Sequence, residues 1–87
     1  MNIRPVDPRD MTWEQDHAVY RVYFWDTAKN HSHEFEVTEA DIDEVLDWTR
    51  GEAKSRGWSY TVYVKVSDEG QPGLTRLCGV AGDPFAV

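Results

Sequence analysis

Apolar and polar positions alternate with a period of two in two parts of the chain, which is typical of half-buried β-strands. In the clearer case, residues 58–66, the apolar face carries Trp58, Tyr60, Val62, Val64 and Val66. In the second case, residues 32–37, the apolar face carries His33, Phe35 and Val37 and the other face carries Glu34 and Glu36. The pattern predicts two strands, the second with an acidic outer side.

Two further segments have the composition of strands. Residues 18–25 are almost all β-branched or aromatic, on both faces, which indicates a central strand. A four-residue loop after this strand would pair Phe24 with His33 and Val22 with Phe35, which keeps one apolar face continuous. Residues 67–73 contain Gly and Pro and predict a turn, followed by a weaker strand at residues 74–80.

Between these two pairs of strands, residues 39–56 have the period of an amphipathic helix. Its apolar stripe consists of Ile42, Val45, Leu46, Thr49 and Ala53. Thr38 is the predicted N-cap and Gly57 the predicted stop. Acidic residues gather in the first turns and basic residues in the last turns, the distribution that the helix dipole favours.

The predicted fold is therefore α+β, a four-stranded antiparallel sheet with one helix packed on one face (ββαββ). The two richest strands belong at the centre, which gives the spatial order 2-1-3-4. The alternative order 1-2-3-4 requires a parallel central pair. We expect a single domain at residues 17–80, a flexible N-terminal arm at residues 1–16 and a C-terminal tail at residues 81–87.

The net charge, the cysteine content and the length of the apolar runs limit which partners and which cellular location are expected. The chain has 87 residues and a net charge of −7, which disfavours direct binding to nucleic acid or to an anionic membrane. Cys78 is the only cysteine, so an internal disulfide and a cysteine-rich zinc site are excluded, and a cytoplasmic location is expected. No apolar run reaches the length of a membrane span.

Few residues are candidates for a metal site, a catalytic nucleophile or a cofactor-binding loop. His17, His31 and His33 are conceivable metal ligands, but zinc needs three or four converging ligands and we predict no metal site. Cys78 stands in no recognisable nucleophile motif, and no glycine-rich sequence links a strand to a helix as in a phosphate-binding loop. The sequence therefore predicts no catalytic residue and no cofactor.

The sheet face turned away from the helix is the main candidate for an interface. It is expected to gather Arg21, Tyr23, Trp25, Glu34, Glu36, Tyr63 and Lys65. Aromatic residues with Arg, ringed by charges, have the composition of a protein-interface centre. A second copy of the chain, as a homodimer, or another protein would cover this face; alternatively, these residues only stabilise cross-strand pairs. Trp48, on the flank of the helix stripe, is a second candidate.

These features favour a small, acidic, non-enzymatic protein-binding module of the immunity, inhibitor or adaptor type. The alternative is a small enzyme or small-ligand binder with a pocket between helix and sheet near Trp58 and His33. A third interpretation, suggested by the acidic helix, is mimicry of nucleic acid.

Overall fold

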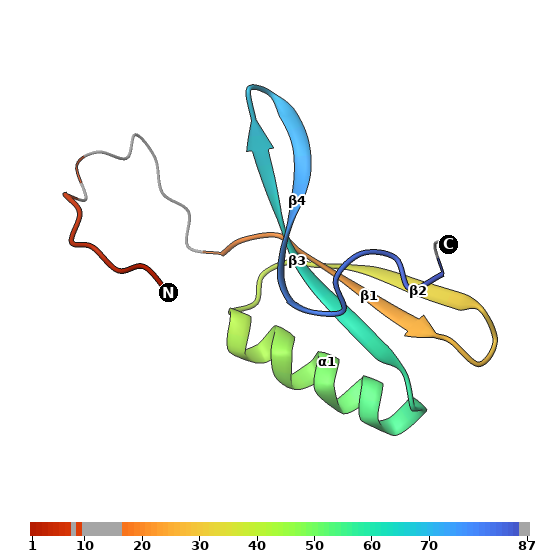
Figure 1. Ribbon diagram of the computed structural model, residues 1–87. Coiled ribbons are helices and arrows are strands. Elements are labelled where there is room, and N and C mark those ends of the chain that lie inside the picture. The colour runs from red at the N-terminus through yellow and green to blue at the C-terminus, as the bar shows by residue number, and fades with distance from the viewer. Residues whose placement is uncertain (8, 10–16, 86–87) are drawn as a thin grey trace.

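The fold, seen in a computed structural model that describes residues 1–7, 9 and 17–85, is a four-stranded antiparallel sheet with one helix (Figure 1). The elements in chain order are β1 (Tyr20–Asp26), β2 (His31–Val37), α1 (Ile42–Arg56), β3 (Ser59–Asp68) and β4 (Gln71–Gly79). The spatial order is β2-β1-β3-β4. The predicted ββαββ arrangement and strand order 2-1-3-4 are thus confirmed.

The predicted register between the first two strands is also confirmed. Phe24 pairs with His33, Val22 with Phe35 and Tyr20 with Val37. On the other side of β1, Val22 pairs with Val62 of β3. Side chains at even positions of β1 and odd positions of β2 therefore share the face under α1, which we call the inner face; the opposite side is the outer face.

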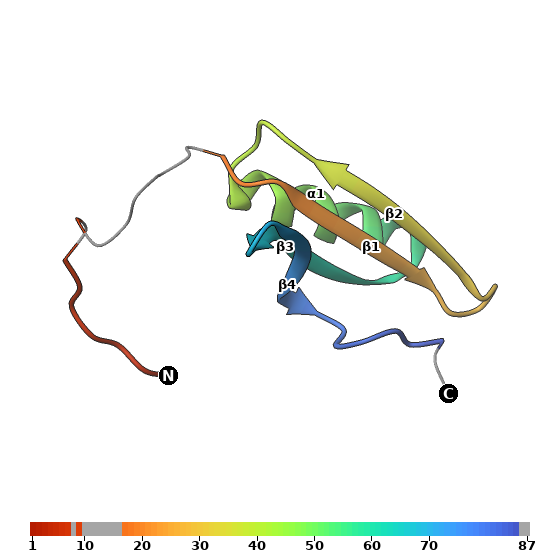
Figure 2. The same cartoon turned by 90° about the horizontal axis from the view of Figure 1, so that it is seen from above.

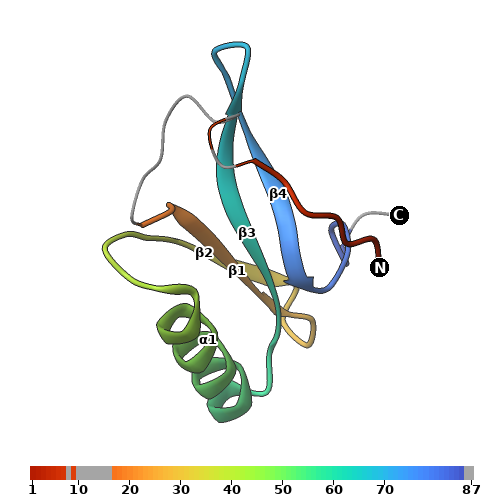
Figure 3. The same ribbon diagram turned by 90° about the vertical axis from the view of Figure 1, so that its left-hand side faces the viewer.

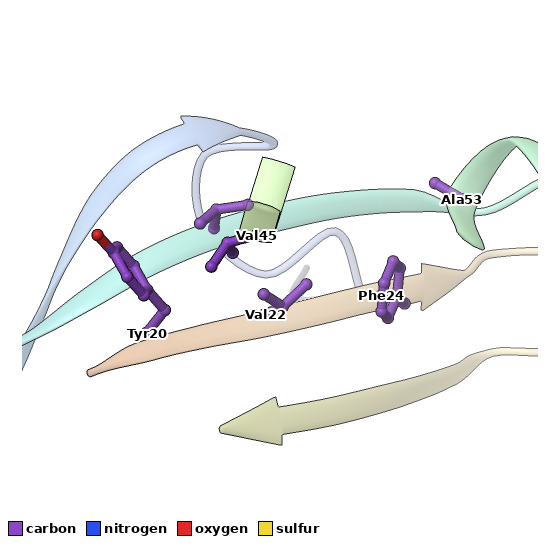
Figure 4. Close-up of a cluster of buried hydrophobic side chains, with 6 residues drawn as sticks. Tyr20, Val22, Phe24, Val45 and Ala53 are labelled. Carbon is purple, nitrogen blue, oxygen red and sulfur yellow. The ribbon is translucent and has the colours of Figure 1, made fainter. Parts of the chain in front are cut away.

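The core lies between the inner face and α1, which forms a second layer on the sheet (Figure 2). Val22, Phe24 and Val62 are at most 1% exposed. From the helix, Val45 and Ala53 are buried above them, and Figure 4 shows Val45 directed at the side chains of β1. The buried helix positions repeat every four residues, as Val45, Thr49 and Ala53, so Leu46 lies on the flank of the stripe and is only partly buried.

The predicted start of the helix was wrong. Asp41, not Thr38, is the N-cap, and the backbone N–H of Asp41 donates to the Glu44 carboxylate at 3.5 Å. Glu39 has φ 55°, a left-handed conformation that no helix residue can adopt. The acidic pair three residues apart therefore sets the start, whereas the predicted stop at Gly57, with φ 71°, is confirmed.

The turn after β3 is also tighter than predicted. Glu69 and Gly70 both have positive φ (49° and 79°), as in a two-residue hairpin turn, so the strands continue through residues expected to form a loop. Pro72 and Gly73 lie in β4, which is an edge strand and can accept a proline. The resulting β3–β4 hairpin extends well past α1 (Figure 3).

Thr49 provides a test of the packing under α1. Its side chain is fully buried, and in the described part of the chain its hydroxyl has no hydrogen-bond partner. An unsatisfied buried hydroxyl costs stability, so Thr49→Val, which has nearly the same shape, is expected to raise the free energy of unfolding by about 1 kcal/mol. Urea denaturation followed by circular dichroism measures the change.

Thr61 is the matched control for this substitution. It is equally buried, but its hydroxyl accepts a hydrogen bond from Trp25 and donates one to the carbonyl of Val80. Thr61→Val is therefore expected to lower the free energy of unfolding by about 1–3 kcal/mol. A destabilising Thr49→Val would show that the Thr49 hydroxyl does have a partner in solution.

Candidate functional site

Ion pairs within the chain link three of the four charged residues expected at an outer-face interface, Arg21, Glu36 and Lys65. Arg21 Nε lies 3.0 Å from Glu36 Oε1, and Lys65 Nζ lies 3.9 Å from the same oxygen. The hydrogen bond to Glu36 raises the pKa of Arg21 above its ordinary value, so this guanidinium stays charged. The cluster links β1, β2 and β3 across the outer face. Its charges therefore have partners without a second protein.

Trp25, expected as an exposed anchor of this face, is only 5% exposed. Its indole N–H donates to Thr61 Oγ1 at 2.9 Å, and the Thr61 hydroxyl donates to the Val80 carbonyl at 2.7 Å. The ring of Phe85 lies edge-on to it at 5.7 Å between centroids. Residues 80–85, which include most of the expected tail, thus place a carbonyl and an aromatic ring against Trp25.

The remaining aromatic residues of the outer face pack on one another. Tyr23 lies between Trp25 and Tyr63, with ring centroids 5.9 Å and 5.0 Å apart. Both tyrosines are partly buried. Glu34 is exposed, and its carboxylate accepts a hydrogen bond from the Ser32 hydroxyl at 2.9 Å. The structure therefore brings all seven predicted outer-face residues onto one side of the sheet, but it leaves little exposed aromatic surface there.

Larger exposed apolar surface lies on the inner face, where α1 meets β2. Phe35 of β2 is 45% exposed and Trp48 of α1 is 39% exposed. Their rings make an edge-to-face contact at 5.6 Å, and each ring also contacts the buried ring of Phe24, at 5.9 Å and 5.5 Å. Phe24 thus anchors two half-exposed aromatic rings to the core.

The two rings lie between two neighbouring hollows. One hollow, of about 450 Å³ and open to solvent, is lined by Phe35, Glu36, Val37, Thr38, Ala40, Glu44, Val45 and Trp48. The other, of about 190 Å³, is lined by Phe24, His33, Phe35, Trp48, Glu52, Arg56 and Trp58. Since Phe35 and Trp48 line both, the two hollows are adjacent, and we call them together the α1–β2 groove.

The width of a helix explains why this groove exists. An α-helix is about 10 Å across, whereas neighbouring strands are about 4.8 Å apart, so one helix covers about two strands. Here α1 packs on β1 and β3, the two central strands. α1 itself then reaches the inner face of β2 only at its border, where Trp48 contacts Phe35. Phe35, which the alternating pattern places on the apolar face, consequently remains half-exposed.

At the other end of the groove, polar and aromatic side chains stack on one another. The ring of His33 is stacked on Trp58, with centroids 4.5 Å apart and planes at 17°. The guanidinium carbon of Arg56 lies 5.1 Å from the centre of the same indole, and Arg56 Nε pairs with Glu52 at 3.3 Å. The pocket expected near Trp58 and His33 is therefore present, although the two side chains fill part of it by stacking.

The other candidate ligands and nucleophiles lie apart. His17 Nε2 is 3.3 Å from Asp41 Oδ1 near the start of α1, whereas the rings of His31 and His33 are 6.4 Å apart on β2. Among the described residues, no group of three or more His, Cys, Asp or Glu side chains is placed to hold a metal ion. Cys78 is half-buried against the core.

Comparisons with known proteins give no relative to draw on. No family model, no curated protein and no solved structure matches the chain. Within the described ranges, no helix is long and apolar enough to cross a membrane. Function must therefore be inferred from the α1–β2 groove and the outer face.

Proposed function

We propose that the protein is a non-enzymatic protein-binding module and that the α1–β2 groove is its binding site. The observation that carries the proposal is the pair of half-exposed rings, Phe35 and Trp48, which share an open hollow of about 450 Å³. Large aromatic side chains at the centre of a surface hollow are the usual anchors of protein interfaces. Ile42, 36% exposed, adds apolar surface at the start of the helix.

The shape of the groove favours a protein segment over a small molecule. Pockets for small ligands enclose most of the ligand within about 300–1,000 Å³. The more enclosed hollow, beside His33 and Trp58, holds only about 190 Å³, whereas the larger hollow is open to solvent. A chain segment can follow this open groove and place one side chain in each hollow.

The outer face is the weaker candidate for the binding site. Trp25 is buried under Phe85, and Arg21 and Lys65 are paired with Glu36. A partner on that face would have to displace contacts that the chain already makes. The α1–β2 groove requires no such displacement, because Phe35 and Trp48 are already exposed.

A binding selection tests the proposal. Random peptides displayed on phage are selected against the immobilised protein, and enriched peptides are synthesised and measured by calorimetry. Binding to Trp48→Gln is expected to be weaker by about tenfold or more, because a central aromatic anchor contributes about 2 kcal/mol or more. Glutamine is a good helix former, so α1 is expected to persist in this variant.

Leu77→Gln is the matched control. Leu77 is 45% exposed, as Phe35 is, but it lies on β4, at the far edge of the sheet from β2. Binding to this variant is expected to equal that of the wild type. Peptides that bind Trp48→Gln as tightly as the wild type would contradict the proposed site.

A further inference from the structure

The two edge strands of the sheet, β2 and β4, differ in how well they are protected against pairing with a further strand. β4 carries Pro72, which has no backbone N–H, and its pairing with β3 shifts register between Val62 and Tyr63. Proline and irregular pairing are the usual means by which proteins block an edge strand. β2 pairs with β1 over seven residues without a shift and has no proline and no lysine, and in the part of the chain that the structure describes no strand lies on its other side. Every second backbone N–H and C=O of β2 therefore points away from β1, has no partner among the described residues, and can pair with an added strand.

The side chains on the two faces of β2 determine which side chains an added strand would need. Its inner-face positions include Phe35 and Val37, which border the α1–β2 groove, and its outer-face positions include Glu34 and Glu36. A strand alongside β2 extends both faces, and its side chains alternate between them. One set of side chains would enter the groove beside Trp48, and the other set would lie on the outer face beside Glu34.

The negative charge of β2 and of the whole chain favours a strand from another protein over a strand from a second copy of this chain. Glu34 is exposed, and among the described residues no cationic side chain lies within ion-pair distance of it. Antiparallel pairing of β2 with its own copy would bring these glutamates together on one face, and like charges in cross-strand positions are unfavourable. The net charge of −7 adds repulsion between copies. A strand with basic side chains on that face would avoid both the repulsion between cross-strand glutamates and the repulsion between two negatively charged copies.

We infer that the partner is an extended protein segment with alternating basic and apolar residues that adds to the free edge of β2 as a fifth strand. Its apolar residues occupy the α1–β2 groove and its basic residues lie beside Glu34, because the Glu36 carboxylate is already paired with Arg21 and Lys65. Main-chain hydrogen bonds to β2 give affinity, and the two faces give specificity. This inference rests on the proposed function and specifies the class of partner for the same site.

A synthetic peptide tests the inference. The probe is a capped seven-residue peptide of alternating Lys and Val, the length of β2. Its control has the same composition in two blocks, four Lys and then three Val, so that charge is unchanged and alternation is lost. The alternating peptide is expected to bind more tightly by about tenfold, because cross-strand pairs contribute about 0.2–1 kcal/mol each and the control cannot form them together. A second control with Glu in place of Lys is expected not to bind.

Amide hydrogen exchange then tests whether the bound peptide pairs with β2 as an added strand. In the free protein, the alternate set of β2 amides that points away from β1 is expected to exchange rapidly, and bound peptide is expected to protect this set. Equal binding by the alternating and block peptides, or binding without protection of β2, would overturn the added strand. If binding without protection is still weakened in Trp48→Gln, the groove remains the site and only the added strand is wrong. If none of the three peptides binds while phage-selected peptides bind through Trp48, the basic, alternating partner is wrong and the proposed function stands.

Discussion

Phe24→Ala is expected to lower the free energy of unfolding by about 3–5 kcal/mol, the range for removal of a buried phenylalanine ring. Phe24 is 1% exposed and contacts the rings of Phe35, Trp48 and Trp58. The substitution removes the support of the groove as well as part of the core. Since a domain of this size has a free energy of unfolding of about 4–13 kcal/mol, much of the chain is expected to lose its structure near 37 °C. Urea denaturation at low temperature measures the loss.

Phe35→Ala is the control for this prediction. Its ring has the same chemistry and contacts Phe24, but it is 45% exposed. The expected loss is about 1–2 kcal/mol, because roughly half of the ring surface is in water in the folded protein. Equal losses for the two variants, or a loss below about 1 kcal/mol for Phe24→Ala, would mean that the core is centred elsewhere.

Gly79→Ala is expected to cost about 2–4 kcal/mol, from a left-handed backbone and a steric overlap together. Gly79 has φ 94°, and a Cβ there would overlap the Tyr60 carbonyl oxygen and lie 2.9 Å from Thr61 Cα. This close approach lets the Val80 N–H donate to the same carbonyl at 2.9 Å. It also places the Val80 carbonyl where Thr61, the partner of Trp25, can donate to it. Chemical denaturation gives the change in stability, and near-ultraviolet circular dichroism is expected to report a changed environment of Trp25.

Gly82→Ala separates the two causes. Gly82 also has a positive φ, 75°, but an added Cβ would meet no atom within 4 Å. Its substitution is expected to cost about 1 kcal/mol, the backbone penalty alone. A cost at Gly79 no larger than the cost at Gly82 would show that β4 can move away from β3 without loss.

Most of the sheet was predictable from the sequence because its register follows from local patterns. The alternation around Val22 and Phe35 leaves one pairing that keeps the apolar face continuous, and that pairing is the one observed. The tight turn at Glu69 and Gly70 was missed because Pro72 and Gly73 argue against a strand in general, although they are acceptable at an edge. Edge position is a property of the whole sheet and is not visible in a local window.

The candidate site was less predictable than the fold. The pattern places Phe35 on the apolar face but does not say how far the helix reaches, so its exposure follows only from the width of α1 over β1 and β3. Conversely, Trp25 was expected to be open because nothing in residues 81–87 has a strand period, whereas one ring of that segment, Phe85, contacts it. Trp48 was found from its place on the flank of the helix stripe. The helical period therefore pointed to one side of the groove, and the pocket expected near Trp58 and His33 pointed to its other end.

Two-dimensional NMR of the indole N–H groups during titration with the alternating Lys–Val peptide tests the central claim most directly. Trp48 lies in the α1–β2 groove on the inner face, whereas Trp25 lies on the outer face with its N–H bonded to Thr61. Binding at the groove is expected to shift the Trp48 signal and the amides of β2 and to leave the Trp25 signal in place. A shift of Trp25 and of the Tyr23 and Tyr63 amides, with Trp48 unmoved, would place the binding site on the outer face and contradict the account.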